Sequence, residues 1–398
     1  MNLKDRIKSL ALKFSQEIIG IRRHIHKYPE ISFQEFRTSE FIASKLNDYD
    51  IPFRKGFVKT GIVAQIEGNN SRKKVIALRA DIDALPINEQ SSLSFKSVNK
   101  GIMHACGHDV HTAALIGTGR ILKELRDELE GTVLLIFQPG EELVPGGAKL
   151  MLEEGALRDP TPDIVIGQHV LPELDTGTFG FREGKYMASN DEIYMTVKGK
   201  GGHAAIPEQT TDTVSIASKI IVALKEMITS YHSADTPTLL SFGKIQGEGA
   251  TNVIPDEVKI DGTFRTFDED WRQKAHFEMK NLAVALAEES GGSCDFKVVQ
   301  GYPSLVNNEK VTSEARKFTE EFIGKKNVFD LDLRMTSEDF AFYSQVFPST
   351  FYRIGVRNKQ KGITSSLHTS TFDIDEEAII HGMGNLAWIA ISFLKYGI

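Results

Sequence analysis

The sequence predicts an α/β protein in which a central mixed sheet flanked by helices is interrupted by a smaller α+β domain. The 398 residues exceed the size of one ordinary hydrophobic core. Short apolar strands alternate with amphipathic helices in both the first and the last parts of the chain. Between about residues 190 and 299 the order becomes strand, helix, strand, strand, helix, strand, the ferredoxin-like order. We therefore expect residues 188–300 to form a domain inserted between 1–187 and 301–398.

Two amphipathic helices open the chain. Apolar residues recur at the helical period from Asp5 to Lys27. A second helix is predicted from Ser32 to about Leu46, because Ser32 and Glu35 match a capping box. In this interpretation, Ile31 and Phe36 form the hydrophobic staple that often accompanies such a box.

Polar residues follow a series of predicted strands. The strand at 74–79 leads to Asp81 and Asp83, that at 131–137 leads to Glu141-Glu142, and that at 163–167 leads to His169. Open α/β sheets bind ligands at the carboxyl ends of their strands. Capping and solvation of a loop is an equally good interpretation of the two aspartates taken alone.

The stretch Met103-His104-Ala105-Cys106-Gly107-His108-Asp109-Val110-His111 concentrates metal-binding residue types in front of a helix predicted from about Thr112 to Glu128. Each feature has an ordinary structural alternative: a buried thiol beside a capping histidine, an exposed acidic turn, a satisfied histidine after a strand. Four such features in successive βα units favour one shared site.

The inserted region and the last part of the chain add two histidines. The glycine-rich loop at 199–205 lacks the Lys-Ser/Thr of a phosphate-binding loop, so we interpret it as a tight turn that presents His203. His368 lies in a glycine- and serine-containing loop at 362–370, before a final apolar helix near 375–394.

Composition limits the possible partners and location. The net charge is −7, and no Lys/Arg run stands out, which argues against nucleic acid or an anionic membrane as partner. The charged N-terminus has no apolar core of a secretion signal. The only cysteines are Cys106 and Cys294, and nothing in the sequence supports a disulfide between them. We expect a cytoplasmic protein.

The candidate ligands suit transition metals. They are one thiol, one carboxylate and three imidazoles: Cys106, His108, Glu142, His169 and His368. Such a set can hold two ions that share the thiolate, and it suits Zn²⁺ and similar ions better than Mg²⁺ or Ca²⁺. Two ions about 3.5–4 Å apart lower the pKa of a water between them. Glu141, beside a ligand, is placed to act as its general base.

These residues resemble the metal-dependent M20 amidohydrolases, and within them the subgroup with hippurate hydrolase, indole-acetyl-amino-acid hydrolase and N-acetyl-diaminopimelate deacetylase. The resemblance covers almost the whole chain. It rests on motifs in family order: Arg79-Ala80-Asp81-Ile82-Asp83-Ala84-Leu85-Pro86, the stretch Met103–Thr112, Gln138-Pro139-Gly140-Glu141-Glu142, Gly199-Lys200-Gly201-Gly202-His203-Ala204, Asn252-Val253-Ile254-Pro255 and Leu367-His368.

The resemblance implies a role for each matching residue. Cys106, His108, Glu142, His169 and His368 would bind two divalent ions (Zn, Mn, Co or Ni), Glu141 would be the general base, and Asp83 would orient a histidine ligand. The inserted domain would be a lid that pairs two subunits into a dimer, or into a tetramer. His203 would then stabilise the oxyanion in the partner's site, and Asn252 and Arg265 would contact substrate.

The expected reaction is hydrolysis of an N-acyl amino acid. A dipeptidase or carboxypeptidase of the same family is the alternative enzyme, and a metal- or amino-acid-binding protein without turnover is the alternative from another class. A serine hydrolase is disfavoured because the sequence has no Gly-x-Ser-x-Gly elbow. The chain departs from the broader peptidase family at Asp81-Ile82-Asp83, where that family has His-x-Asp. It also has Cys106 in place of a bridging carboxylate, so the native metal stays open.

Overall fold

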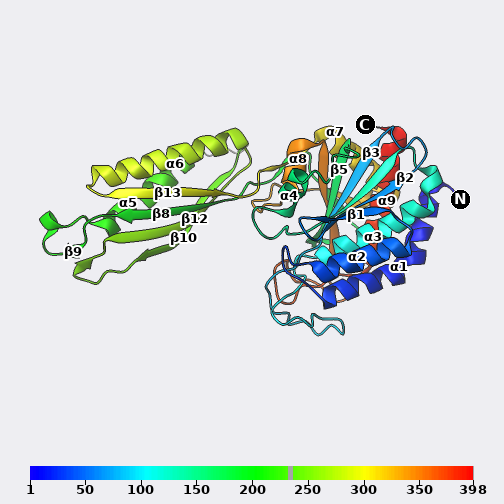
Figure 1. The fold of residues 1–398 in the computed structure, drawn as a ribbon, viewed down its shortest axis with the longest axis horizontal. Helices are drawn as coiled ribbons and strands as arrows, with labels where there is room; N and C mark the ends of the chain where they lie inside the picture. The colour runs from blue at the N-terminus through cyan, green and yellow to red at the C-terminus, as the bar shows by residue number, and fades with distance from the viewer. Residues whose placement is uncertain (232–235, 398) are drawn as a thin grey trace. The chain divides into compact units, whose positions relative to one another are not determined.

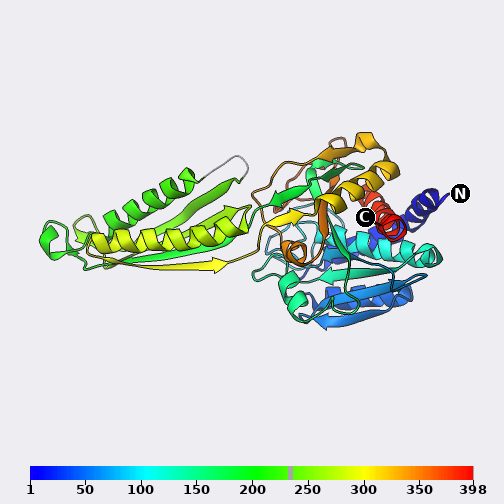
Figure 2. The same ribbon diagram turned by 90° about the horizontal axis from the view of Figure 1, so that it is seen from above.

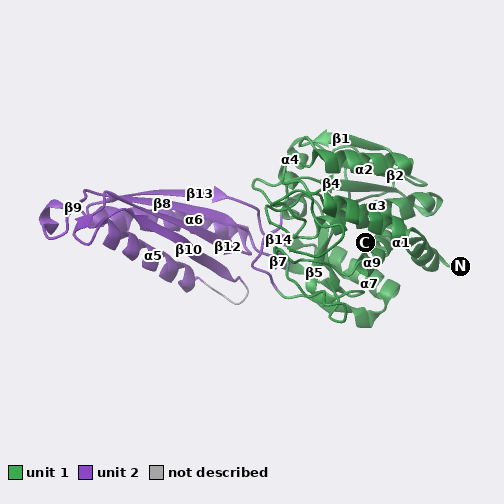
Figure 3. Ribbon diagram, turned by 90° about the horizontal axis from the view of Figure 1, so that it is seen from below, with its two compact units in different colours: residues 1–184, 306–332, 339–398 green, residues 185–305, 333–338 purple. Residues whose placement is uncertain are grey.

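The computed structural model describes residues 1–231 and 236–397, which form two compact units (Figures 1 and 3). The first unit comprises 1–184, 306–332 and 339–398, and the second comprises 185–305 and 333–338. The region that we expected as an insertion, 188–300, lies within the second unit. That unit also includes 333–338, which the sequence had led us to place in the last part of the first domain.

The first unit contains an eight-stranded mixed sheet, as predicted, with the order β1-β2-β4-β3-β5-β16-β6-β15. Its central strands β4, β3, β5 and β16 are parallel neighbours, and antiparallel pairs flank them. The strands are β1 Phe53–Phe57, β2 Gly61–Glu67, β3 Val75–Asp81, β4 Thr132–Gln138, β5 Ile164–Asp175, β6 Phe179–Phe181, β15 Val328–Asp330 and β16 Ser349–Arg357. Short strands β7 Gly184–Met187 and β14 Leu305–Asn307 lie where the chain passes between the units.

Helices cover this sheet. They are α1 Leu3–Lys27, α2 Phe36–Asp48, α3 His108–Glu124, α4 Gly147–Glu153, α7 Glu309–Ile323, α8 Ala341–Val346 and α9 Glu377–Tyr396. Figure 2 shows the N-terminal helix α1 beside the C-terminal helix α9, and both pack on α3. By length and composition α9 is apolar enough to cross a membrane, yet 83% of its most apolar window is buried inside the protein. It is therefore a core helix, apolar on all sides.

Parallel pairing aligns the carboxyl ends of three strands. Asp81 of β3 pairs with Gln138 of β4, and Arg79 of β3 pairs with Gly167 of β5. Two predicted boundaries were wrong. The strand β5 continues to Asp175, so His169 lies inside it rather than after it, and α3 begins at His108, four residues before the predicted start.

The predicted capping box at the start of α2 was also wrong. The helix begins at Phe36 with Glu35 as N-cap, but the Glu35 side chain does not cap it. The Glu30 carboxylate caps it instead, and it accepts from the Thr38 N–H at 2.9 Å. Phe33 has a φ of +64°, which interrupts the helical path after Ser32. Phe36 is 53% exposed, so it forms no hydrophobic staple with Ile31. Ser32 and Glu35 make hydrogen bonds elsewhere in the unit.

The second unit is a four-stranded antiparallel sheet with the order β10-β12-β8-β13 and two helices. This is the split β-α-β order. Alternate residues of β8 are buried, and they pack with the apolar faces of both helices in a separate core. The elements are β8 Asp191–Lys198, β9 Gly202–His203, α5 Thr213–Ser230, β10 Thr238–Gly247, β11 Val253–Ile254, β12 Glu257–Thr266, α6 Glu269–Glu289 and β13 Ser293–Gln300.

A buried ion cluster fastens α6 to β8. Asp191, at the start of β8, accepts hydrogen bonds from Arg272 Nε at 2.8 Å and His276 Nε2 at 2.7 Å. Burial alone would raise the pKa of Asp191, but the hydrogen bonds from Arg272 and His276 outweigh it and hold the pKa below its usual range. The carboxylate thus stabilises the fold only while it is ionised.

We expect Asp191→Ala to destabilise the second unit by about 3–5 kcal/mol at pH 7, because it leaves the buried guanidinium of Arg272 without its partner. The native pKa lies below the unfolded one, so the stabilisation is complete above about pH 4 and is lost on acidification. Denaturant unfolding at several pH values measures both effects. The control Asp295→Ala removes an exposed pair with Lys198 and should cost under about 1 kcal/mol. An equal cost for the two variants would contradict this account.

Candidate metal centre

Gly107 sets the direction of the central loop. It has a φ of +82°, and a Cβ there would lie 2.6 Å from Val170 Cγ2. Glycine is therefore required both for the turn and for the close approach to β5. The turn places Cys106 just before α3, and His108 is the first residue of that helix. Both side chains are buried beside the strand ends.

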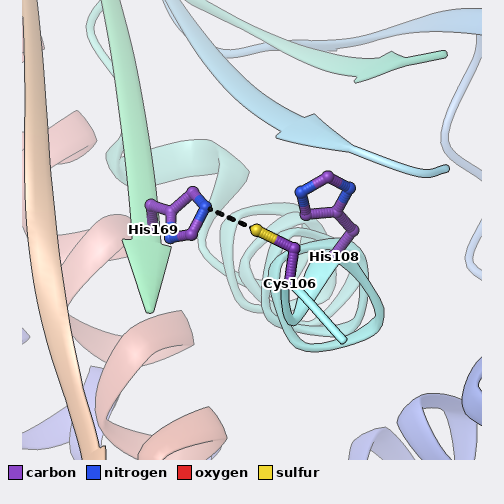
Figure 4. Close-up of side chains that lie close together, drawn as sticks. All are labelled: Cys106, His108 and His169. Carbon is purple, nitrogen blue, oxygen red and sulfur yellow. Dashed lines mark hydrogen bonds between the residues drawn. The ribbon is translucent and has the colours of Figure 1, made fainter. Parts of the chain in front are cut away.

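Hydrogen bonds at Nδ1 orient two of the histidines. His108 Nδ1 donates to the Asp83 carbonyl at 2.9 Å, and His169 Nδ1 donates to the Val170 carbonyl at 2.8 Å. Each ring therefore presents Nε2 toward the centre of the site. His169 Nε2 lies 3.5 Å from Cys106 Sγ, as Figure 4 shows. Burial and the charge of Arg353 lower the pKa of His169, which keeps its ring neutral, as metal binding requires.

Glu141 and Glu142 follow β4 in an irregular turn, so both carboxylates can approach the same histidine. Glu141 Oε2 and Glu142 Oε1 each lie 3.9 Å from His108 Nε2. In a regular backbone, adjacent side chains would diverge. Within the described residues, His108 Nε2 is buried and has no hydrogen-bond partner. Buried polar atoms of this kind are the ones that an ion would satisfy.

His368 completes the group from the last part of the chain. Its backbone has a φ of +59°, and its N–H donates to the Ala105 carbonyl at 2.8 Å. Its Nε2 lies 3.3 Å from Cys106 Sγ and 3.3 Å from Glu142 Oε1. These interactions with Cys106 and Glu142 raise the pKa of His368 to about 10. A bound cation would compete with that proton for the ring nitrogen.

The structure thus brings all five predicted ligands together. They form two overlapping groups that share the thiol, Cys106-His108-His169 and Cys106-Glu142-His368. The donor atoms within each group lie within 4.8 Å of one another. Burial and the charge of Glu142 raise the pKa of the Cys106 thiol, and a cation would reverse that shift. Cys106 and Cys294 are both free thiols, which excludes a disulfide between them.

His111 belongs to a third group with Asp81 and His108, but the protein already occupies both of its ring nitrogens. Nδ1 donates to Asp81 Oδ1 at 2.6 Å, and Nε2 accepts from the Val170 N–H at 2.9 Å. His111 therefore supports the strand beside His169 and has no lone pair left for an ion. Sequence reasoning did not assign this role, although Asp81 and His111 lie within the quoted motifs.

A buried polar network supports the turn behind the glutamates. Arg79 binds Asp81 Oδ2 at 2.6 Å and Asp339 Oδ1 at 2.7 Å. Asp339 also accepts from Gln138 Nε2 at 2.7 Å and from the Ala148 N–H at 2.9 Å. Arg79 thus pairs with both aspartates, and groups of β4 and α4 donate hydrogen bonds to Asp339. These interactions offset the free-energy cost of burying the charges. We predicted no role in the site for Asp339 from the sequence.

The remaining predicted residues lie in the second unit. His203 is exposed on β9, which pairs with β11, and the Asn252 carbonyl accepts from the next N–H, that of Ala204. Arg265 is half-buried near the far end of β12, where its Nη1 donates to the Met335 carbonyl at 3.1 Å. By strand rise, roughly 25 Å of β12 separates Arg265 from the two-stranded sheet of β9 and β11. Within one chain, Arg265 therefore does not meet His203 and Asn252.

Comparison with known proteins places this arrangement in a family. Residues 77–389 match the model of peptidase family M20/M25/M40. The chain is 40% identical to the N-acetyl-L-cysteine deacetylase of Bacillus subtilis over 96% of this chain and 89% of that one. It is 36% identical to thermostable carboxypeptidase 1 of Saccharolobus solfataricus over 99% of both chains. It is 38% identical to the N-acyl-L-amino acid amidohydrolase of Geobacillus stearothermophilus over 77% and 82%.

Solved structures agree with this result. A protein from methicillin resistant Staphylococcus aureus superposes with a TM-score of 0.92 and 32% identity, covering 99% of this chain and all of that one. The Bacillus subtilis YXEP protein, described as a dinuclear metal binding peptidase from the M20 family, superposes with a TM-score of 0.84 and 34% identity, covering 96% and 99%. The α/β fold is thus shared with a metal-binding peptidase structure.

The two ligand groups that share Cys106, and the fully hydrogen-bonded ring of His111, lead to a spectroscopic prediction. Cobalt(II) added to the protein should give a thiolate-to-metal charge-transfer band, because Cys106 belongs to both groups. Cys106→Ser should abolish that band. His111→Gln should keep it, because His111 has no free nitrogen to offer. A band that is lost in His111→Gln and kept in Cys106→Ser would reverse the assignment.

Proposed function

Because the chain belongs to peptidase family M20/M25/M40, we propose that it hydrolyses the amide bond of N-acyl amino acids to a free amino acid and a carboxylate. The chain is an enzyme of this family that acts on amides. The observation that carries the proposal is the meeting of five ligand-type side chains beside Glu141, a buried carboxylate that follows a strand end.

The residues present fit two divalent ions. His108 Nε2 is buried without a hydrogen-bond partner among the described residues, and it lies 3.9 Å from Glu142 Oε1. Mixed nitrogen, oxygen and sulfur donors suit Zn, Mn, Co or Ni, and the shared position of Cys106 suits a thiolate between two ions. When bound, such ions supply Lewis acidity and lower the pKa of water. Cys106, His108, Glu142, His169 and His368 would hold them.

Glu141 supplies the proton transfers. Its carboxylate takes a proton from the attacking water and later delivers it to the nitrogen of the leaving amine, so the group is unchanged at the end of the cycle. Asp83 accepts from His108 Nδ1 and from the Glu142 N–H at 3.0 Å, and thereby keeps both side chains aimed at the site. His203 donates to the carbonyl oxygen as negative charge develops there.

The second unit supplies the lid and a dimer contact in this proposal. β10 lies at the edge of its sheet and exposes Leu239 and Ile245, a surface suited to pairing with a second copy. The long separation of Arg265 from His203 and Asn252 fits a site in which β9 and β11 come from the partner chain. Arg265 and Asn252 would bind the carboxylate or carbonyl of the substrate. The two free thiols are consistent with a reducing compartment such as the cytoplasm.

A carboxypeptidase is the second candidate, because two relatives from Saccharolobus solfataricus carry that name. The same water chemistry cleaves a peptide or an acyl amide, so the metal-binding residues do not discriminate. The difference lies in which group the acyl side of the site accepts.

We expect Glu141→Gln to lower kcat by about 10²–10⁴-fold, because the amide cannot accept the proton. Fold and metal content should be unchanged, which circular dichroism and elemental analysis measure alongside the rate. The control Glu154→Gln alters a carboxylate that accepts from the Val58 N–H, and it should keep the parent rate. If Glu141→Gln turns over substrate as fast as the parent, Glu141 is not the base.

A substrate panel should separate the two candidate functions. Release of amine from N-acetyl and N-benzoyl amino acids, with Mn²⁺, Zn²⁺, Co²⁺ or Ni²⁺ added, is expected to exceed release from dipeptides by about tenfold or more in kcat/KM. A preference for dipeptides would favour the carboxypeptidase. Tight metal binding without turnover on any member of the panel would favour a binding protein.

A further inference from the structure

Residues 32–35, here called the 32–35 segment, lie against the loops that carry the proposed metal ligands. The sequence motif Ser32-Phe33-Gln34-Glu35 matches a capping box, yet neither Ser32 nor Glu35 caps α2. Both side chains instead bond to residues of the site. Formation of α2 therefore does not explain why the chain has Ser32 and Glu35 at these positions.

Glu35 holds the turn before Glu141. Its Oε1 accepts from the Gly140 N–H at 2.9 Å and from the Phe33 N–H at 2.8 Å, while its Oε2 accepts from Thr60 Oγ1 at 2.8 Å. The residue is fully buried. Since Gly140 directly precedes Glu141, the bond fixes the backbone from which the proposed base extends.

Ser32 holds the other support of the site. Its hydroxyl donates to Asp83 Oδ2 at 2.6 Å. The same oxygen accepts from the Glu142 N–H at 3.0 Å, and Asp83 Oδ1 lies 3.2 Å from His108 Nδ1. The hydroxyl therefore fixes the rotation of a carboxylate that touches two proposed ligands.

Phe33 closes the segment over the turn. Gly140 has a φ of +63°, and a Cβ added to it would lie 2.3 Å from Phe33 Cε1. Phe33 itself has a φ of +64°, an unusual backbone conformation for a bulky residue. The close packing of an aromatic ring on this glycine leaves the turn little room to move.

The burial of Glu35 is costly for the fold alone. Burial, together with the charge of Asp83, raises the pKa of Glu35 to about 7. Within the described residues, no Lys, Arg or His forms an ion pair with it, so its charge is balanced only by hydrogen bonds. Because the Glu35 side chain does not cap α2, capping of that helix does not account for its burial. Acidic residues in such surroundings are typical of functional sites.

We propose that Ser32 and Glu35 are positioning residues for hydrolysis: Glu35 acts through Gly140 on Glu141, and Ser32 acts through Asp83 on His108 and Glu142. The inference rests on the proposed function, because it assigns these residues to the same site. It predicts two separable effects, one on the rate and one on metal affinity.

The test compares Glu35→Ala, Glu35→Gln and Ser32→Ala with the parent. Glu35→Ala should lower kcat about 10–100-fold, with KM changed less than about threefold, because the base is misplaced while binding groups remain. Glu35→Gln should recover kcat to within about threefold, since its amide oxygen still accepts from Gly140 and its amide N–H can donate to Thr60. Ser32→Ala should weaken metal affinity about 10–100-fold, measured by chelator competition with Zn²⁺.

A matched control removes a buried hydrogen bond remote from the site. Asn385, on α9, donates to Thr319 on α7 at 3.1 Å. Asn385→Ala should lower the Tm and leave kcat and metal affinity at parent values. If Glu35→Ala and Ser32→Ala behave like this control, with lower Tm and parent kcat and affinity, the positioning role is overturned.

Two further outcomes are decisive. If Glu35→Ala does not fold, Thr60→Val takes its place, because it removes only the bond to Oε2. A parent kcat in Thr60→Val together with parent metal affinity in Ser32→Ala would then overturn the role. If the parent hydrolyses no substrate of the panel, the proposed function fails. Loss of Zn²⁺ affinity in Ser32→Ala alone would then still support the positioning of the ligands.

Discussion

The site depends on β3 lying between β4 and β5 as their parallel neighbour. This register brings Asp83, the Glu141-Glu142 turn and His169 close together on the carboxyl-terminal side of the central strands. Cys106 and His108 approach them there from the start of α3. Few side chains could meet in this way in an antiparallel sheet, where successive strand ends alternate between edges. Buried hydrogen bonds among Arg79, Gln138 and Asp339 join β3 and β4 to the segment before α8 beneath the site.

A hydrogen bond at the other ring nitrogen fixes the direction of two of the proposed histidine ligands. Backbone carbonyls bind Nδ1 of His108 and His169, so both rings point Nε2 inward. The same principle removes His111 from the set, because its two nitrogens are both bonded. Spacing along the chain would have favoured His111 as much as His108, and only the geometry separates them.

Much of the fold and site could be predicted from the sequence because it depends on local pattern. Alternation of strands and helices predicted the mixed sheet. Polar residues after strands and before the third helix predicted four of the five proposed ligands, and His368 was found in a loop of the last part of the chain. Ser32 and Glu35 show the limit. Their spacing is that of a capping box, but burial of Glu35 beneath the Gly140 turn depends on contacts more than one hundred residues away in the chain, which no local pattern contains. Asp339, also a distant partner, was missed for the same reason.

The central claim is that five side chains from distant parts of the chain hold two ions that share Cys106. Crystals grown with Zn²⁺ or Mn²⁺, measured on both sides of the metal absorption edge, test it directly by anomalous scattering. The account predicts two peaks about 3.5–4 Å apart, both adjacent to the sulfur of Cys106. A single peak remote from Cys106, or a peak bonded to His111, would contradict it.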